Sequence, residues 1–268
     1  MPYVDFKNTR VSYRVDGDGE PLILVHGTGG DAESNWSALV EPLSDEWKLI
    51  RPDYAGSGKT MDDGRPLTAD DLVEQILAVA DVAGASSFHL LGFSLGAALA
   101  ARIAGDHPER VRSLILVNGF ASSDETRLQL QFTLWRDLIR TDRPAMARLI
   151  MLTGFSPSAL ASFSAESLQQ IIDTTVADTN WEGMARQVDL DLSINVTESV
   201  ARIIAPTLVI GCSHDHMVPP GHARNLADTI VGARYMELPS GHLVPMEQPR
   251  ALTEQVSAFL REQRKSLQ

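Results

Sequence analysis

The segment Phe88-His89-Leu90-Leu91-Gly92-Phe93-Ser94-Leu95-Gly96 decides the fold class of this chain. It joins an apolar run to a G-x-S-x-G pattern, and the small residues Ala97–Ala101 follow it. The pattern predicts a strand, a tight turn that carries Ser94, and a helix. Both glycines are expected there because a Cβ would collide with the neighbouring strand or helix. The free N–H groups and positive dipole end of the helix would lie beside Ser94, where they favour a developing negative charge.

The length and composition of the chain limit its domain organisation and the class of its partners. The chain has 268 residues, enough for one large domain or for a core with a modest insertion. Its formal net charge of −12 argues against nucleic acid or an anionic membrane as the main partner. The only cysteine in the sequence, Cys212, excludes an intramolecular disulfide. The N-terminal segment lacks the features of a signal peptide and no apolar run reaches membrane-spanning length, so we expect a cytoplasmic protein.

Strand-like runs alternate with helical patterns at both ends of the chain. The apolar run Pro21–Val25 is typical of a strand buried on both faces, and Val11–Gly19 is interpreted as part of an N-terminal hairpin. From about residue 120 to residue 202 the alternation stops and the pattern is helical. We therefore predict an α/β fold with a mostly parallel sheet and helices on both faces, formed by residues 1–119 and 203–268. Residues 120–202 would form a helical insertion over the strand ends.

A serine hydroxyl needs an adjacent base, and His242 is the candidate. It lies in Leu238-Pro239-Ser240-Gly241-His242, directly after the last predicted strand. Loops at the carboxyl ends of parallel strands meet at one sheet edge, where open α/β sheets place their sites. Four other histidines lie within a strand, at helix ends or in a loop that they would support, namely His26, His89, His107 and His222.

Asp215 is the candidate for the carboxylate that orients this base. It follows the predicted strand Thr207–Gly211 and is flanked by His214 and His216. The flanking histidines raise a metal cluster as an alternative, but adjacent residues in one loop rarely converge on one ion, so no metal is expected. Asn118, which ends the preceding strand, cannot carry the charge. The order serine, acid, histidine along the chain is the order expected for this type of turn.

A carbonyl attacked by Ser94 would need two N–H donors for its oxygen. We expect one to be the backbone of Leu95 and the other to be that of Thr28, in the loop His26-Gly27-Thr28-Gly29-Gly30. This loop has neither the Lys-Ser/Thr ending nor the G-x-G-x-x-G spacing of phosphate-binding loops. We therefore predict no cofactor.

With these residues assembled, the chain resembles the α/β-hydrolase superfamily over nearly its whole length. The resemblance lies in His26-Gly27, Asp53 with Gly56 and Gly58, Gly92–Gly96, Asp215 with Pro219, and Gly241-His242 followed by Glu247 and Pro249. It implies a serine hydrolase with a Ser-Asp-His triad, and it implies that residues 120–202 are a cap that forms the acyl or alcohol pocket. Ser94 stands where haloalkane dehalogenases and epoxide hydrolases have an aspartate, which sets those two activities aside.

We predict cleavage of an ester-like bond, a carboxylester or a lactone, in a small to medium and fairly apolar molecule through an acyl-enzyme at Ser94. The predicted pocket walls are Phe93, Leu243, Trp135 and Val218. Thioester hydrolysis, carbon–carbon bond hydrolysis and cofactor-free perhydrolysis use similar residues and stay open. So do a ligand-binding or signalling role and a non-hydrolytic lyase or cyclase role. The sequence does not indicate the oligomeric state.

Overall fold

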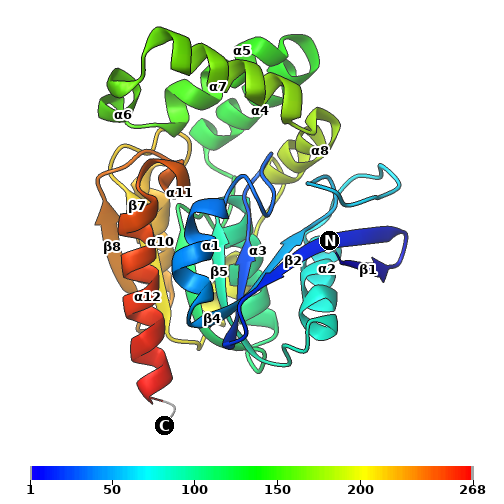
Figure 1. Cartoon of the computed structure of the whole chain (residues 1–268), viewed down its shortest axis with the longest axis vertical. Helices are drawn as coiled ribbons and strands as arrows, with labels where there is room; N and C mark the ends of the chain where they lie inside the picture. The colour runs from blue at the N-terminus through cyan, green and yellow to red at the C-terminus, as the bar shows by residue number, and fades with distance from the viewer. Residues whose placement is uncertain (1, 267–268) are drawn as a thin grey trace.

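The computed structural model describes residues 2–266 and contains an eight-stranded sheet with the order β1-β2-β4-β3-β5-β6-β7-β8 (Figure 1). The pairs from β4 through β3 to β8 are parallel, whereas β2 is antiparallel to both β1 and β4. The predicted mostly parallel α/β sheet is confirmed. The strands are β1 (Tyr3–Phe6), β2 (Thr9–Asp16), β3 (Glu20–Val25), β4 (Trp47–Asp53), β5 (Phe88–Phe93), β6 (Val111–Val117), β7 (Thr207–Cys212) and β8 (Arg234–Leu238).

The N-terminal hairpin differs in one respect from the expectation. Strand β2 forms its hairpin with β1, across a turn in which Lys7 has a φ of 51°. Residues 16–19 lead instead from β2 to β3, and these two strands do not pair because β4 lies between them. Both edges of the buried strand β3 are occupied by parallel partners, so β2 pairs at the far edge of β4.

Helices cover both faces of the sheet, as the alternation of patterns predicts (Figure 1). In β3, Leu22 and Leu24 pack into one apolar core and Ile23 and Val25 into the other, because successive side chains of a strand point to opposite faces. The first core is closed by α1 (Ser37–Ser44) and α12 (Pro249–Ser266), the second by α2 (Ala69–Val82), α3 (Leu95–Asp106) and α10 (Pro220–Thr229).

Six helices follow β6 before β7 begins. They are α4 (Thr126–Thr141), α5 (Arg143–Gly154), α6 (Pro157–Ser162), α7 (Ala165–Asp178), α8 (Trp181–Asp191) and α9 (Thr197–Ala201). Capping residues delimit several of them, since Asp142, Ser156, Ser164 and Asn180 each accept a hydrogen bond from a backbone N–H of the following helix. Helices α4–α8 form a layer beyond the carboxyl ends of the parallel strands (Figure 1). Within residues 2–266, no helix combines the length and the apolar character needed to cross a membrane.

Candidate active site

Ser94 lies at the junction of β5 and α3, with φ 55° and ψ −122°. A positive φ is rare for a residue with a side chain and costs about 1–3 kcal/mol, so the surrounding structure has to enforce it. A Cβ added to Gly92 would collide with the backbone of Gly96, and one added to Gly96 would collide with the carbonyl of Val25. The two glycines of the pattern therefore permit the close approach of strand and helix that holds the strained serine.

A chain of hydrogen bonds runs from Ser94 through His242 to Asp215. The Ser94 hydroxyl lies 3.0 Å from Nε2 of His242, and Nδ1 of His242 lies 2.6 Å from Oδ2 of Asp215. Because a carboxylate only accepts, Nδ1 carries the imidazole proton and Nε2 is left to accept from the serine. The structure thus brings together the three residues predicted as nucleophile, base and orienting acid.

The carboxylate of Asp215 is held by more than the histidine. Its second oxygen, Oδ1, accepts hydrogen bonds from the backbone N–H groups of Met217 and Val218 at 2.9 and 2.8 Å. The side chain is fully buried. These donors fix the carboxylate in the plane from which it can orient the imidazole.

The loop that carries His242 is fixed from three sides. The side-chain amide of Asn118 donates to the carbonyl of His242 at 2.8 Å, and the Phe93 ring lies 5.0 Å from the imidazole. The carboxylate of Glu247 accepts from the backbone N–H groups of Gly241 and of Ser156, at the start of α6. The position of the His242 imidazole is therefore set by the sheet and by the helical layer together.

Two backbone N–H groups beside Ser94 are suited to bind an oxyanion. Leu95 is the first residue of α3, so its N–H has no intrahelical acceptor. In the loop after β3, the Gly27 N–H donates to Asn35 and the Gly29 N–H donates to Gln187. Between them, the Thr28 N–H has no acceptor within residues 2–266. A Cβ added to Gly27 would lie 2.9 Å from that of Ser94, so this loop passes directly over the serine.

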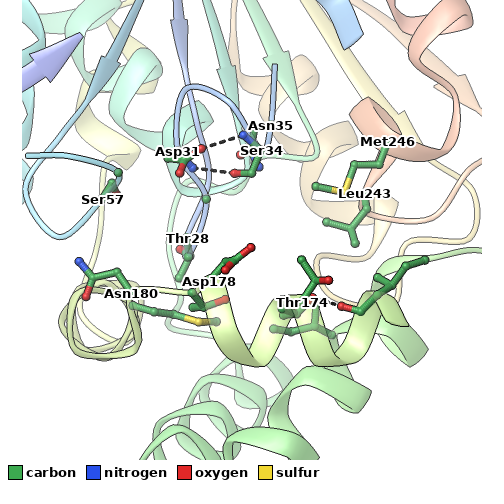
Figure 2. Close-up of a pocket in the computed structure, with 18 of the residues that line it drawn as sticks. Thr28, Asp31, Ser34, Asn35, Ser57, Thr174, Asp178, Asn180, Leu243 and Met246 are labelled. Atoms are coloured by element: carbon green, nitrogen blue, oxygen red, sulfur yellow. Dashed lines mark hydrogen bonds between the residues drawn. The ribbon is translucent and has the colours of Figure 1, made fainter. Parts of the chain in front are cut away.

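A cavity of about 720 Å³ lies between this loop and the helical layer (Figure 2). Its wall includes Thr28, which carries one of the two candidate oxyanion donors, and Leu243, which follows His242, while Ser94 and His242 lie outside this wall. Its wall carries both polar and apolar side chains. The polar ones include Asp31, Ser34, Asn35, Ser57, Thr174, Asp178 and Asn180, and the apolar ones include Ile150, Met151, Phe155, Leu243 and Met246.

Of the four predicted wall residues, only Leu243 lines this cavity. Phe93 is buried behind His242 and against Trp36, and Val218 is buried where its N–H holds Asp215. Trp135 is buried against Phe132 in the core of the layer. Phe93 and Val218 show that closeness to Ser94 or Asp215 in sequence does not fix the direction of a side chain. Trp135 shows that an aromatic residue of the helical layer can pack in the core of that layer.

Residues of α8 complete the site, and the sequence interpretation did not include them. Gln187 holds Gly29, and the Thr28 hydroxyl donates to Oδ2 of Asp191 at 2.7 Å. The signal that could have found them is the spacing of Gly183, Gln187 and Asp191, four residues apart and thus on one helix face.

A cysteine nucleophile and a metal site are two alternatives to chemistry at Ser94. Burial raises the pKa of the Cys212 thiol to about 12, so it is not a thiolate nucleophile near neutral pH. Among residues 2–266, no three or more His, Cys, Asp and Glu side chains are gathered as a metal site. His214 and His216 therefore do not join Asp215 as ligands.

The fold and this geometry define the class of protein. The sequence model of the α/β-hydrolase fold matches residues 20–249, and the chain belongs to this family. It is 49% identical over 260 residues to pyrrolizixenacetamide deacetylase of Xenorhabdus hominickii, covering 97% of this chain and 98% of that protein. It is 28% identical, over 97% of this chain and 98% of the relative, to a putative carbamate hydrolase, RutD, of Azorhizobium caulinodans.

Solved structures agree with this assignment. The enol-lactonase of Burkholderia xenovorans LB400 superposes with a TM-score of 0.86 at 27% identity, over 97% of this chain and all of that one. Members with different names, a deacetylase, a carbamate hydrolase and a lactonase, thus share this architecture. The protein is a hydrolase of the α/β-hydrolase fold.

Proposed function

We propose that the protein is a serine acyl hydrolase that cleaves an ester-like bond of a small molecule through an acyl-enzyme at Ser94. The single observation that carries this proposal is the hydrogen-bond chain from Ser94 through His242 to Asp215, with distances of 3.0 and 2.6 Å. A serine within hydrogen-bond reach of a base that is itself oriented by a carboxylate is an activated nucleophile.

The steps follow from the positions of the atoms. Nε2 of His242 takes the proton of the Ser94 hydroxyl while Oγ attacks the carbonyl carbon. The N–H groups of Leu95 and Thr28 stabilise the oxyanion of the tetrahedral intermediate. His242 then gives its proton to the leaving group, and the acyl group stays on Ser94. Water, deprotonated by His242, attacks the acyl carbonyl and releases the acid and the free serine.

The helical layer formed by residues 120–202 acts in this proposal as a cap that completes the substrate pocket. Its helices α5 and α7 supply one wall of the 720 Å³ cavity, and the loop after β3 supplies the other. A cavity of this size suits a small to medium molecule. The apolar side chains around Phe155 and Leu243 can take an apolar part of the substrate, while the polar side chains of the wall can hydrogen-bond to the remainder.

A second candidate bond is an amide. It is favoured by one observation, the 49% identity to a protein named as a deacetylase of pyrrolizixenacetamide. The triad chemistry is the same for an ester and an amide, except that an amide leaves only when His242 protonates its nitrogen. A small acyl group on an ester or an amide is therefore the proposed substrate feature.

The test uses matched acetyl esters and acetyl amides, together with p-nitrophenyl esters of increasing acyl length. We expect steady multiple turnover, fastest with short acyl groups, and no measurable hydrolysis by Ser94→Ala. A burst of product without turnover would support the ligand-binding alternative instead. Full hydrolytic activity in Ser94→Ala would contradict the proposal.

A further inference from the structure

One face of α8 is built against the loops that surround Ser94. Gly183, Gln187 and Asp191 are four residues apart, so they lie in one row along the helix. A Cβ added to Gly183 would collide with the backbone of Gly56, which shows how closely the helix approaches the loop after β4. The row therefore starts with a backbone contact and continues with two polar side chains.

Both polar side chains of the row bind the loop after β3, residues 26–30, which is called the oxyanion loop below. The Gln187 amide accepts from the Gly29 N–H at 2.8 Å and donates to the Ser57 hydroxyl at 2.7 Å. Asp191 accepts from the Thr28 hydroxyl at 2.7 Å. Gly27 on the other side is held by Asn35 at 2.9 Å. The residues before and after Thr28, and the Thr28 side chain itself, are thus each held in place.

Stability alone does not explain an aspartate at the end of this row. Asp191 is 1% exposed, and its second oxygen, Oδ1, has no hydrogen-bond partner within residues 2–266. Burial of a carboxyl group that is only partly hydrogen-bonded is unfavourable. Burial also raises the pKa of Asp191 to about 7. A residue that weakens the fold and contacts the oxyanion loop points to a role in the site.

We infer that Asp191 is a positioning residue of the oxyanion site, which orients the backbone N–H of Thr28 toward the substrate carbonyl oxygen through the Thr28 hydroxyl. This inference rests on the proposed function, because it assumes that a carbonyl is attacked at Ser94. Oxyanion donors act mainly in the transition state, so a misdirected donor lowers kcat more than it raises KM.

The experiment removes the hydrogen bond between the Thr28 hydroxyl and the Asp191 carboxylate by changing one residue or the other. Thr28→Val and Asp191→Ala each delete it, whereas Thr28→Ser and Asp191→Asn keep a donor or an acceptor in place. We expect kcat to fall about tenfold or more in the first two variants, with KM within about twofold, and to be largely retained in the other two. The double variant Thr28→Val/Asp191→Ala should lose no more than either single variant, since both remove one interaction.

Two further measurements separate this role from a loss of structure and from a failure of the proposed function. Val188→Ala removes a buried side chain of the same helix that belongs to the apolar core, and it should lower the melting temperature without lowering kcat. The rate of Ser94 labelling by an organophosphonate, whose oxygen occupies the oxyanion site, should fall in Thr28→Val and Asp191→Ala but not in Val188→Ala.

Wild-type kcat and labelling rates in Thr28→Val and Asp191→Ala would overturn the inference and leave Ser94 as the nucleophile. An equal fall of kcat in Val188→Ala would overturn it too. Full activity in Ser94→Ala would overturn the proposed function and the inference with it.

Discussion

Helices α7 and α8 follow each other in the chain and both lie over the site, but they are built differently. Helix α8 buries seven of its eleven residues, including Gln187 and Asp191, whereas α7 buries only Ile172 of its fourteen. The polar side chains of α8 bind the loops around Ser94. By contrast, Thr174 and Asp178 of α7 face the cavity (Figure 2), and Ser167 and Gln170 of the same helix also line it. In the proposed function, the difference means that α8 would support the reacting groups and α7 would shape the space for the substrate.

The largest effect expected from the difference between α7 and α8 is a pH dependence of the free energy of unfolding, caused by the buried Asp191 of α8. Burial raises the pKa of Asp191 from 3.8 to about 7, so between these values the folded protein keeps a proton that the unfolded chain has lost. The free energy of unfolding therefore falls as the pH rises from about 4 to about 7, by on the order of 4 kcal/mol. Asp191→Asn removes this contribution.

Urea unfolding of the wild type and of Asp191→Asn at pH 4 and pH 8 measures it. Other titrating groups contribute equally to both proteins, so the difference between them isolates Asp191. We expect the variant to gain stability relative to the wild type as the pH rises. An identical pH dependence of the two proteins would show that the buried carboxyl does not titrate in this range.

A larger side chain at Gly183 should displace α8 from the loop after β4. The backbone contact with Gly56 leaves no room for a Cβ, so Gly183→Val is expected to lower the free energy of unfolding by about 1–3 kcal/mol. Because the same helix holds the oxyanion loop, kcat should fall as well, by about tenfold. Ala177→Val on the exposed face of α7 is the matched control and should change neither quantity appreciably. Equal losses in the two variants would remove the distinction between the helices.

Helix α7 should respond to the loss of its N-terminal cap. The Ser164 hydroxyl accepts from the Ser167 N–H at 3.0 Å, and Ser164→Ala leaves that donor to solvent. We expect a loss of about 1 kcal/mol in the free energy of unfolding, with kcat unchanged. Hydrolysis kinetics and urea unfolding of the same preparation check both parts, and a kcat that falls with the cap would tie α7 to the reacting groups.

The smallest effect is expected from the cavity-facing side of α7. Thr174→Leu replaces a polar wall residue by a larger apolar one, so it should change KM by about two- to fivefold and favour more apolar substrates, with kcat nearly unchanged. The series of p-nitrophenyl esters measures this shift. A change in kcat alone, with the same KM throughout the series, would argue that α7 does not contact the substrate.

Much of the fold could be predicted because the relevant signals are local. The apolar runs of the parallel strands and the glycines around Ser94 each reflect steric demands of a few neighbouring residues. The grouping of Ser94, Asp215 and His242 followed from strand order, since loops at the carboxyl ends of parallel strands converge. The catalytic roles themselves stay predictions.

The parts that the sequence did not reveal depend on contacts between distant segments. Helical periodicity in residues 120–202 identifies helices but not which helix face meets which loop. Trp135 shows this, because an aromatic residue in the layer is as well suited to its core as to a cavity wall. Asp191 is a second example. A carboxylate at the end of a helix usually points into solvent, but the side chain of Asp191 is buried and accepts a hydrogen bond from Thr28.

The most direct test of the central claim, that Ser94 is a nucleophile served by an oxyanion site, is mass spectrometry of the protein after reaction with an organophosphonate. We predict one adduct, on the peptide that contains Ser94, formed more slowly in Thr28→Val and absent in Ser94→Ala. Active protein that forms no adduct, or carries it on another residue, would contradict the account.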